Sequence, residues 1–415
     1  MGIAIALTSC QTMYKSTSPA AKATTPTITL RFSGWQSSPS EGKLLQQIIQ
    51  DFEAKHPHID VQYEAINSEY MDVIRTRLIG DVAPDVFYLD AFEAPQLIKY
   101  GVLEPLNPYI SPEFDLADFE PTLLHAFKQN NTLYGLPKDF STLALFYNKQ
   151  MFAQAGIPHP PQTWDELQTI SRQLTIDTNR DRKPDQYGFG LAPELARQTF
   201  MLKAFGGQLN NSQGYATFAS PASLRGLEQV IEQYRRDRTA AQPTDVGATS
   251  GSEMLGQGKA AMVIEGPWAI PYLQDTFPSL KFGIAEVPTV NGKRGTMAYT
   301  VAYVINRKSH HKPAAWTFIA YLTSRQGMKT WAKQGLVLPS RRSLLTELGY
   351  TTNPQYAPFV NGASYATIWQ ATDTLPTLRT HFNNQFISAL LGEQSLSQAM
   401  QKAEAAANQE IYWSN

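Results

Sequence analysis

Residues 28–65 read ITLRFSGWQSSPSEGKLLQQIIQDFEAKHPHIDVQYEA, and this stretch decides the fold class. The alternating residues from Ile28 to Phe32, and again those over 61–65, predict two strands. Between them, apolar side chains recur at helical spacing on one face: Leu44, Leu45, Ile48, Ile49 and Phe52. A strand, a helix and a second strand in succession predict a parallel sheet with a crossover helix, and therefore an α/β fold.

The same alternation of elements continues along the chain. Residues 85–89 predict a third strand, and Thr163-Trp164-Asp165-Glu166 has the form of a capping box that opens a helix running to about Leu174. Residues 260–264, 282–285 and 300–305 predict further buried strands. After about Lys312 the pattern is mostly helical.

Length and composition limit the class of protein. A chain of 415 residues exceeds what one hydrophobic core usually organises, so two lobes are expected. The apolar and charged fractions, 42% and 17%, are ordinary for a globular protein, and no stretch reaches the roughly 20 apolar residues of a spanning helix. The net charge of -1 argues against nucleic acid as a partner and favours a neutral or weakly charged ligand.

The single cysteine, Cys10, follows a short apolar run. Leu7-Thr8-Ser9-Cys10 resembles the bacterial lipobox, and this implies a lipid anchor on the thiol that holds the protein on the periplasmic side of a bacterial membrane. Residues 1–26 then comprise a signal remnant, the lipobox and a flexible tether rich in Ser, Thr, Ala and Lys. The alternative is a cysteine without a role, because no basic segment precedes the apolar run.

An ordered series of short motifs covers most of the chain. They are Phe52-Glu53-Ala54-Lys55-His56-Pro57, Ala83-Pro84-Asp85-Val86-Phe87, Leu136-Pro137, Phe146-Tyr147-Asn148-Lys149, Pro161-Gln162-Thr163-Trp164-Asp165-Glu166-Leu167, Gly258-Lys259-Ala260-Ala261-Met262 and Gly266-Pro267-Trp268. In this order the chain resembles the extracellular sugar-binding proteins of ABC importers, the group that contains the maltose- and trehalose-binding proteins.

The resemblance implies a periplasmic-binding-protein fold with two discontinuous lobes around a hinge and a ligand cleft. One lobe is expected to hold residues 27–138 plus 302–340, and the other 142–298 plus 341–415, with the hinge near 139–142, 298–302 and about 340. It also implies a binding protein without catalysis or cofactor. Such a protein closes on a disaccharide or small oligosaccharide and, as a monomer, delivers it to the membrane subunits of the transporter.

A neutral sugar presents an apolar face of C–H groups and a ring of hydroxyls, so its site needs aromatic rings and hydrogen-bonding side chains. By its place after a buried strand, Trp268 matches the stacking aromatic of the family; the alternative is a core tryptophan. Trp35 lies in the loop after the first strand, where it contacts the ligand or packs on its own lobe. Tyr299 and Tyr303 flank the second crossing between the lobes. Each either stacks on the sugar, donates a hydrogen bond to it, or only packs within the protein.

Polar candidates occupy the ends of strands and the crossings. Asp90 follows the third strand and either accepts from paired hydroxyls or caps a helix. Asp139 stands at the first crossing, where the family often has a polar sugar ligand, and Glu41 is a weaker candidate. Arg341 and Arg342 offer planar guanidinium groups to hydroxyls or are surface charges.

One acidic loop lies outside this scheme. Its oxygen-bearing side chains alternate as in calcium loops: Asp177, Asn179, Asp181 and Asp185. Arg180 and Arg182 interrupt the loop, and Gly188 stands where an EF-hand needs its bidentate Glu, so an Asx-rich turn is favoured over a structural calcium site.

Two other classes of function remain open at this point. A secreted glycoside hydrolase also has sugar-binding aromatics and carboxylates, but it requires a paired acid and base at a defined separation. A sensory receptor domain for a different solute is the other alternative. Neither H-E-x-x-H nor G-x-S-x-G nor a P-loop is present.

Overall fold

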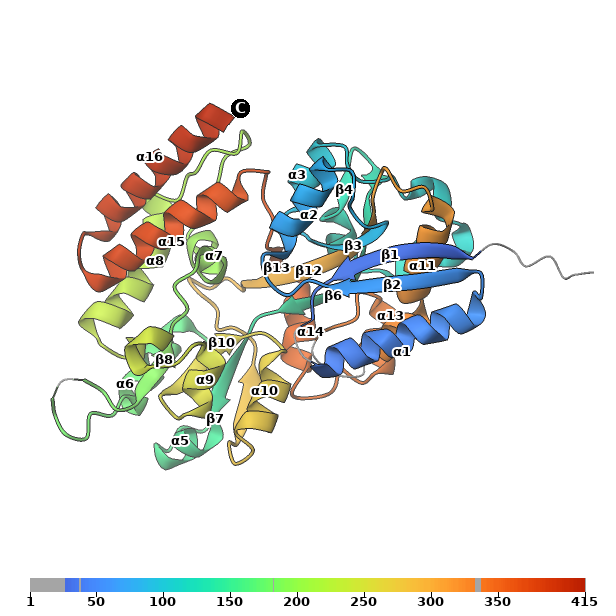
Figure 1. The fold of residues 1–415 in the computed structure, drawn as a ribbon. Helices are drawn as coiled ribbons and strands as arrows, with labels where there is room; N and C mark the ends of the chain where they lie inside the picture. The colour runs from blue at the N-terminus through green and yellow to red at the C-terminus, as the bar shows by residue number, and fades with distance from the viewer. Residues whose placement is uncertain (1–26, 37–38, 182, 333–336, 415) are drawn as a thin grey trace, which may run out of the picture.

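Two β-sheets organise the chain. The computed structural model describes residues 27–36, 39–181, 183–332 and 337–414, and in these residues one sheet has six strands and a second has five. The sheets lie in two bodies of helices and strands that meet along the middle of the molecule (Figure 1). This arrangement is the two-lobed α/β architecture that the sequence predicted.

The first sheet has the order β13-β12-β3-β1-β2, with β6 paired to β12. Its strands are β1 Ile28–Gly34, β2 Ile59–Ala65, β3 Val86–Asp90, β6 Gly135–Thr142, β12 Thr296–Ile305 and β13 Ala366–Ile368. β1 runs parallel to both β2 and β3, which confirms the prediction made from residues 28–65. β12 begins at Thr296 rather than at Thr300, because its first residues pair with β13 and β6 instead of ending as a loop.

Helices cover this sheet and enclose its core. They are α1 Pro39–Lys55, α2 Tyr70–Ile79, α3 Ala94–Lys99, α4 Pro121–His125, α11 Lys312–Leu322, α12 Arg325–Ala332 and α13 Arg342–Glu347. The short strands β4 Lys128–Gln129 and β5 Thr132–Leu133 form a separate hairpin. On α1, Leu45, Ile48, Ile49 and Phe52 are buried as their spacing predicted, and they join the strands in one apolar cluster.

The second sheet has the order β11-β7-β10-β8-β9. Its strands are β7 Ala144–Asn148, β8 Tyr187–Gly190, β9 Ala240–Ala241, β10 Ala260–Glu265 and β11 Phe282–Ala285. The helices of this lobe are α5 Lys149–Gln154, α6 Trp164–Leu174, α7 Leu195–Ala204, α8 Pro221–Ile231, α9 Gly251–Gly256, α10 Ala269–Thr276, α15 Leu375–Leu391 and α16 Leu396–Ser414. At the start of α6, the Thr163 hydroxyl accepts from the Glu166 amide, as the predicted capping box requires.

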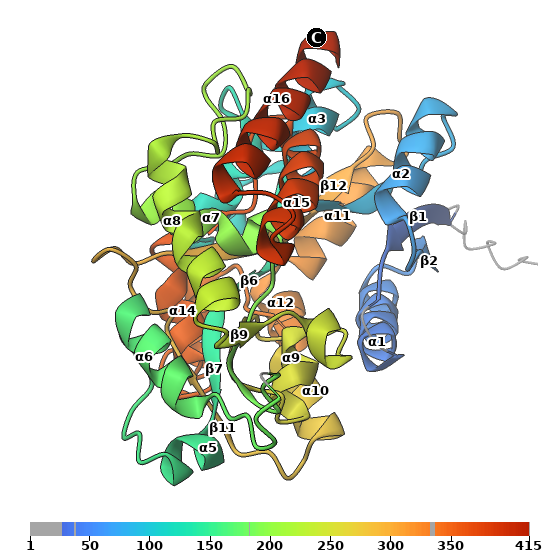
Figure 2. The same ribbon diagram turned by 90° about the vertical axis from the view of Figure 1, so that its left-hand side faces the viewer.

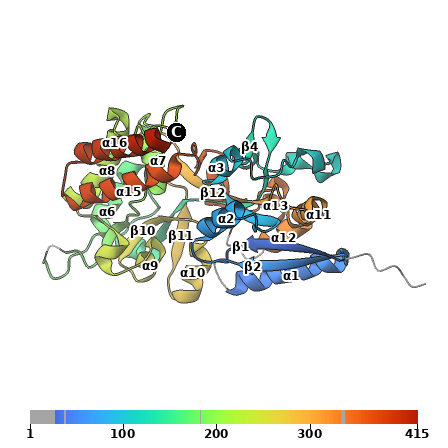
Figure 3. The same ribbon diagram turned by 45° about the horizontal axis from the view of Figure 1, so that its top comes forward.

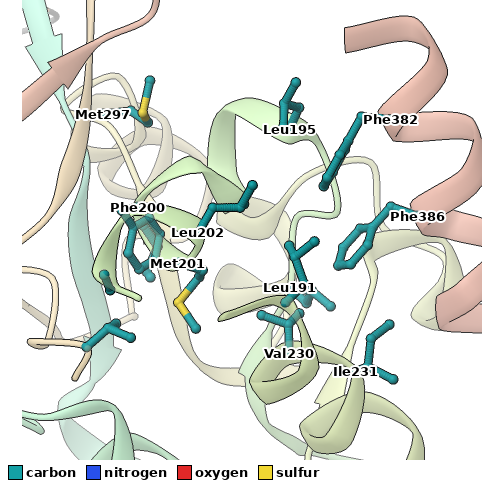
Figure 4. Packing of buried hydrophobic residues seen from close by; sticks show 14 of the residues in the cluster. Leu191, Leu195, Phe200, Met201, Leu202, Val230, Ile231, Met297, Phe382 and Phe386 are labelled. Atoms are coloured by element: carbon teal, nitrogen blue, oxygen red, sulfur yellow. The ribbon is translucent and has the colours of Figure 1, made fainter. Parts of the chain in front are cut away.

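The long C-terminal helices are part of the second lobe. α15 and α16 pack against each other and cover α7 and α8 (Figure 2). The close-up in Figure 4 shows Phe382 and Phe386 beside Leu191, Leu195, Val230 and Ile231 in the largest apolar cluster. Burial of these side chains fixes α7, and α7 carries one wall of the candidate site.

The chain passes between the lobes along continuous strands. β6 of the first sheet ends at Thr142, and β7 of the second sheet begins at Ala144. β12 runs alongside β6 at the same junction (Figure 3). Leu338 pairs with Phe140, so a third segment joins the first two there.

Part of the segment after residue 340 packs on the first lobe, although we expected all of it on the second. We expected 341–415 to belong to the second lobe, but Ser343 of α13 bonds to Asp118 and Arg325 pairs with Glu347, both within the first lobe. Helix α14 (Ala357–Ala363) lies at the junction, where Thr142 donates to the Phe359 carbonyl. β13 then joins the first sheet, whereas Phe359 of α14 packs against Phe146 of β7 in the second lobe, and α15 and α16 belong to the apolar core of that lobe.

Candidate functional site

A cavity of about 590 Å³ opens on the second lobe at the carboxyl end of β10. The chain around it comes from the start of α7, the start of α9 and the segment that leads into α10. Side chains of the types that sugars require line it, among them Glu194, Arg197, Thr249, Glu265, Trp268 and Tyr272. The volume falls in the range of small-molecule sites, about 300–1,000 Å³.

Trp268 forms an aromatic wall of this cavity. Its side chain is 37% exposed although most large apolar residues of the lobe are buried. The indole folds back over Gly266, where a Cβ atom would lie 2.1 Å from the ring, so only glycine permits this position. A partly exposed aromatic ring that lines a cavity is the kind of group on which the C–H face of a sugar stacks.

A buried ion pair lies beneath the indole. Glu265 is 4% exposed, and its Oε2 accepts from Nη2 of Arg197 at 3.0 Å. The Arg197 guanidinium carbon lies 5.9 Å from the centre of the Trp268 ring. Burial by itself lowers the pKa of Arg197, but the Glu265 carboxylate more than offsets this and holds the pKa above its ordinary value.

Tyr299 connects this cavity to the junction between the lobes. It lies on β12, and its ring meets that of Trp268 edge to face with centroids 6.2 Å apart. Burial raises the pKa of Tyr299 to about 12, with smaller contributions from Arg197 and the nearby carboxylates, Asp90 among them. The phenol therefore stays protonated at neutral pH and can donate to a ligand hydroxyl.

Asp90 stands at the end of β3, opposite Val301 of β12. Its Oδ1 accepts from the Phe92 amide at 2.9 Å, so it closes a turn, although the N-cap residue of α3 is Glu93. Burial raises the pKa of Asp90 to about 7, and the hydrogen bond from the Phe92 amide limits that rise. Of these three predicted residues, Trp268 lines the cavity, Tyr299 contacts the Trp268 ring, and the Asp90 carboxylate lies close enough to Tyr299 to raise its pKa.

The other predicted residues gather inside the first lobe. Asp139 is 4% exposed, pairs with Lys138 and accepts from the Trp331 indole at 2.9 Å. Lys138 lies over the Trp331 ring, 4.4 Å from its centre. Burial raises the pKa of Tyr303, and the carboxylates of Asp139 and Glu41 add to that rise.

Trp35 and Glu41 border the same group. Trp35 is partly buried, and its ring meets Tyr70 and Tyr88 edge to face at 5.0 and 5.1 Å. Glu41, on the first turn of α1, is 7% exposed. Both predicted residues therefore border an aromatic and acidic cluster that packs within the first lobe.

The comparison with protein families decides the identity of the chain. A family model described as bacterial extracellular solute-binding protein matches residues 36–329. The chain belongs to this family of solute-binding proteins.

Individual relatives agree with this assignment. A binding protein of Brucella abortus is 25% identical over 339 residues, 80% of this chain and 80% of that protein. The maltotriose-binding protein of Pyrococcus abyssi is 24% identical over 293 residues, 69% of this chain and 60% of that one. An ABC substrate-binding protein of Listeria monocytogenes, solved in complex with cycloalternan, superposes with a TM-score of 0.82 at 22% identity and covers 93% of this chain and 99% of its own.

These similarities confirm the predicted family and the two-lobed fold. The similar proteins are sugar-binding proteins of ABC importers and not enzymes, as we expected of this solute-binding protein. They also exclude the glycoside hydrolase interpretation.

The two arginines of the solute-binding protein do not reach the cavity. Arg341 is 3% exposed, and its guanidinium donates to the carbonyls of Thr323, Asp115 and Phe114 within the first lobe. Burial and these bonds occupy the guanidinium, so the structure does not bring Arg341, predicted as a sugar ligand, to the cavity. Arg342 donates to the Ala117 carbonyl on the same part of the first lobe and is not brought together with Trp268.

The acidic loop of the solute-binding protein forms turns. Asp185, Asn179 and Asp181 each accept from a backbone amide of the loop itself. Among the described residues, no cluster of three or more His, Cys, Asp or Glu side chains is arranged to hold a metal ion. The geometry matches the Asx-rich turn that the sequence favoured over calcium at Asp177, Asn179, Asp181 and Asp185.

Sequence reasoning missed the polar floor of the cavity. Arg197 lies within α7 and Glu265 ends β10, and neither stands in a recognisable motif. The only available signal was the position of Glu265 directly before Gly266-Pro267-Trp268. Tyr272, on the exposed face of α10, was missed for the same reason.

The predicted lipid attachment at Cys10 lies outside the described residues. Within the residues that are described, helices fall short of the length and apolarity that membrane crossing requires.

Proposed function

We propose that this solute-binding protein captures a disaccharide or small oligosaccharide between its lobes and delivers it to the membrane subunits of an ABC importer. The observation that carries the proposal is the exposed Trp268 indole above the buried Arg197–Glu265 pair, in a cavity next to the crossing strands. Such a surface combines an apolar platform with hydrogen-bonding groups, which is what a neutral sugar needs. Maltotriose and cycloalternan, named for two of the similar proteins, are both glucose oligomers.

The first lobe would supply the opposite side of the cleft. Asp90 and Tyr299 lie where the lobes meet, whereas the other predicted residues, Trp35, Glu41, Asp139 and Tyr303, pack behind them within the first lobe. A sugar that contacts both lobes stabilises the closed form by the added contacts, and the transporter then recognises the closed form.

The hinge would lie at the crossing strands. Phe140 pairs with both Thr300 and Leu338, which supports bending near 139–142, 298–302 and about 340. The contacts of α13 favour extending the first lobe, 27–138 plus 302–340, to about residue 347, whereas α14 contacts both lobes. The second lobe then holds 142–298 and the two C-terminal helices.

A ligand panel tests the proposal. Purified protein is heated with maltotriose, mannotriose, trehalose, sucrose, putrescine or a glycerophosphodiester, and hits are measured by calorimetry. We expect at least one neutral sugar to raise Tm, because ligand at 100 times Kd adds about 2.7 kcal/mol to the free energy of unfolding. Stabilisation by putrescine or the phosphodiester alone would contradict the proposal.

Two further measurements concern closure and turnover. With the bound sugar at saturation, small-angle scattering should show a smaller radius of gyration at the mass of one chain. The sugar should be recovered intact after prolonged incubation. An unchanged radius of gyration would contradict closure of the lobes. Release of monosaccharide would contradict binding without catalysis.

We also propose that Cys10 carries the lipid anchor on the periplasmic side of the membrane. The support is the lipobox-like sequence Leu7-Thr8-Ser9-Cys10 together with the extracellular family. In bacterial cells, Cys10→Ala should move the protein from the membrane fraction to the soluble fraction. Retention of the variant in the membrane fraction would refute the anchor.

A further inference from the structure

The cavity is lined by one positively charged side chain and three acidic side chains. The ionisable groups that line it are Glu194, Arg197, Glu265 and Asp275. Arg197 is paired with Glu265, so the two together carry no net charge. Glu194 and Asp275 are exposed and add negative charge. An anionic ligand would therefore meet net repulsion in a partly desolvated site.

The position of the pair is fixed from three sides. Nη1 of Arg197 donates to the Ile264 carbonyl at 2.6 Å, and Nη2 donates to Oε2 of Glu265 at 3.0 Å. Oε1 of Glu265 lies against Gly251, where a Cβ atom would be only 2.6 Å away. Neither side chain can turn aside without leaving the charge of the other unpaired in a largely buried position, which is strongly unfavourable.

The guanidinium keeps donors for a ligand. It has five N–H bonds, and two are used by Ile264 and Glu265. No other protein acceptor is bonded to it within the described parts of the chain, and its side chain lines the cavity beside Trp268. The remaining donors are left for hydroxyl or ring oxygens of a molecule bound in the cavity.

We propose that the Arg197–Glu265 pair determines the ligand class of this cavity. The fork of Arg197 donates to the hydroxyls of the bound sugar, and Glu265 neutralises that fork so that neutral sugars bind and uronates are rejected. This inference rests on the proposed sugar-binding function and deepens it by naming neutral sugars as the class.

Removal of the neutralising carboxylate tests the inference. The best neutral sugar of the panel is compared by calorimetry with its uronate, in which a terminal C6 hydroxymethyl group is oxidised to a carboxylate. In the wild-type protein the uronate should bind at least tenfold more weakly. In Glu265→Gln the Arg197 charge is no longer balanced, so the ratio of the two Kd values should move at least tenfold toward the uronate.

A matched control separates a local effect from general charge. Glu228→Gln changes the net charge of the protein by the same amount at an exposed position on α8 outside the cavity, where solvent screens it, and should change the ratio less than threefold. An equal shift in both variants, or none in Glu265→Gln, would overturn the inference.

A second variant covers the case in which Glu265→Gln does not fold. In Arg197→Gln/Glu265→Gln both charges are absent, so rejection of the uronate should persist while the neutral sugar binds about tenfold more weakly for lack of the donor fork. Unchanged affinity for the neutral sugar would overturn the role of Arg197. If no neutral sugar binds to the wild-type protein, the proposed function fails; if one binds but the variants behave like wild type, only this inference fails.

Discussion

Two groups of similar side chains face different surroundings on the two lobes. In the first lobe, Lys138, Asp139 and Trp331 form an ion pair with an indole in a closed interior. In the second lobe, Arg197, Glu265 and Trp268 repeat the same kinds of side chain, but the indole is 37% exposed at a cavity.

The difference teaches that residue type alone does not mark a binding surface. In the first group, both the indole N–H and the ammonium are directed at Asp139, so the carboxylate serves the protein itself. In the second group, the Arg197 guanidinium donates to the Ile264 carbonyl, and the Trp268 indole stays partly exposed. The first group should chiefly support stability, and the second chiefly affinity.

The largest expected effect is on stability in the first lobe. Asp139→Ala leaves the Lys138 ammonium buried without its partner, and the free energy of unfolding should fall by about 3–5 kcal/mol. Urea unfolding measures the loss. Asp275→Ala, exposed on the second lobe, serves as the control and should change stability by less than about 0.5 kcal/mol. A similar small loss for Asp139→Ala would remove the contrast between the two groups.

The next prediction distinguishes Trp268, expected to affect sugar affinity, from Trp331, expected to affect stability. Trp268→Ala should weaken binding of the sugar about 10- to 100-fold, or about 1.4–2.8 kcal/mol, with little change in unfolding free energy. Trp331→Phe keeps an aromatic ring, although a smaller one, but loses the donor to Asp139, so stability should fall by about 1–2 kcal/mol with affinity nearly kept. Calorimetry and urea unfolding of both variants check this. The opposite pattern would reverse the roles given to the two indoles.

The last effect is a pH dependence at Asp90, which lies between the two groups. Its pKa of about 7 in the folded protein is above that of an unfolded Asp, so the folded protein binds more protons than the unfolded chain between about pH 4 and 7. The contribution of Asp90 to stability is therefore most favourable below about pH 4 and is lost as the pH rises through 7. One such group changes stability by at most about 1.4 kcal/mol per pH unit.

Asp90→Asn removes this titration. The difference in unfolding free energy between wild type and variant should change between pH 5.5 and 8.5 and favour the variant at the higher pH. A constant difference across that range would show that Asp90 keeps an ordinary pKa.

Much of the fold could be predicted because local patterns report on burial. The apolar face of α1, the Thr163 cap and the buried strand β10 each follow from residues close together in sequence. The site was predicted less evenly. Trp268 follows the buried strand β10 and Asp90 ends the buried strand β3, which are positions the sequence marks, whereas Arg197 carries no such local signal.

From the sequence by itself one could determine the α/β class, the family resemblance and the strand ends that carry Trp268 and Asp90, because these depend on spacing and on short motifs. Only the tertiary structure decided that Arg341 is enclosed in the first lobe and that Arg197 meets Glu265 beneath an indole. The physical reason is that desolvation and pairing depend on neighbours far apart in the chain. Residue 197 bonds to residues 264 and 265, and Arg341 bonds to the carbonyls of residues 114 and 115, contacts that no local pattern encodes.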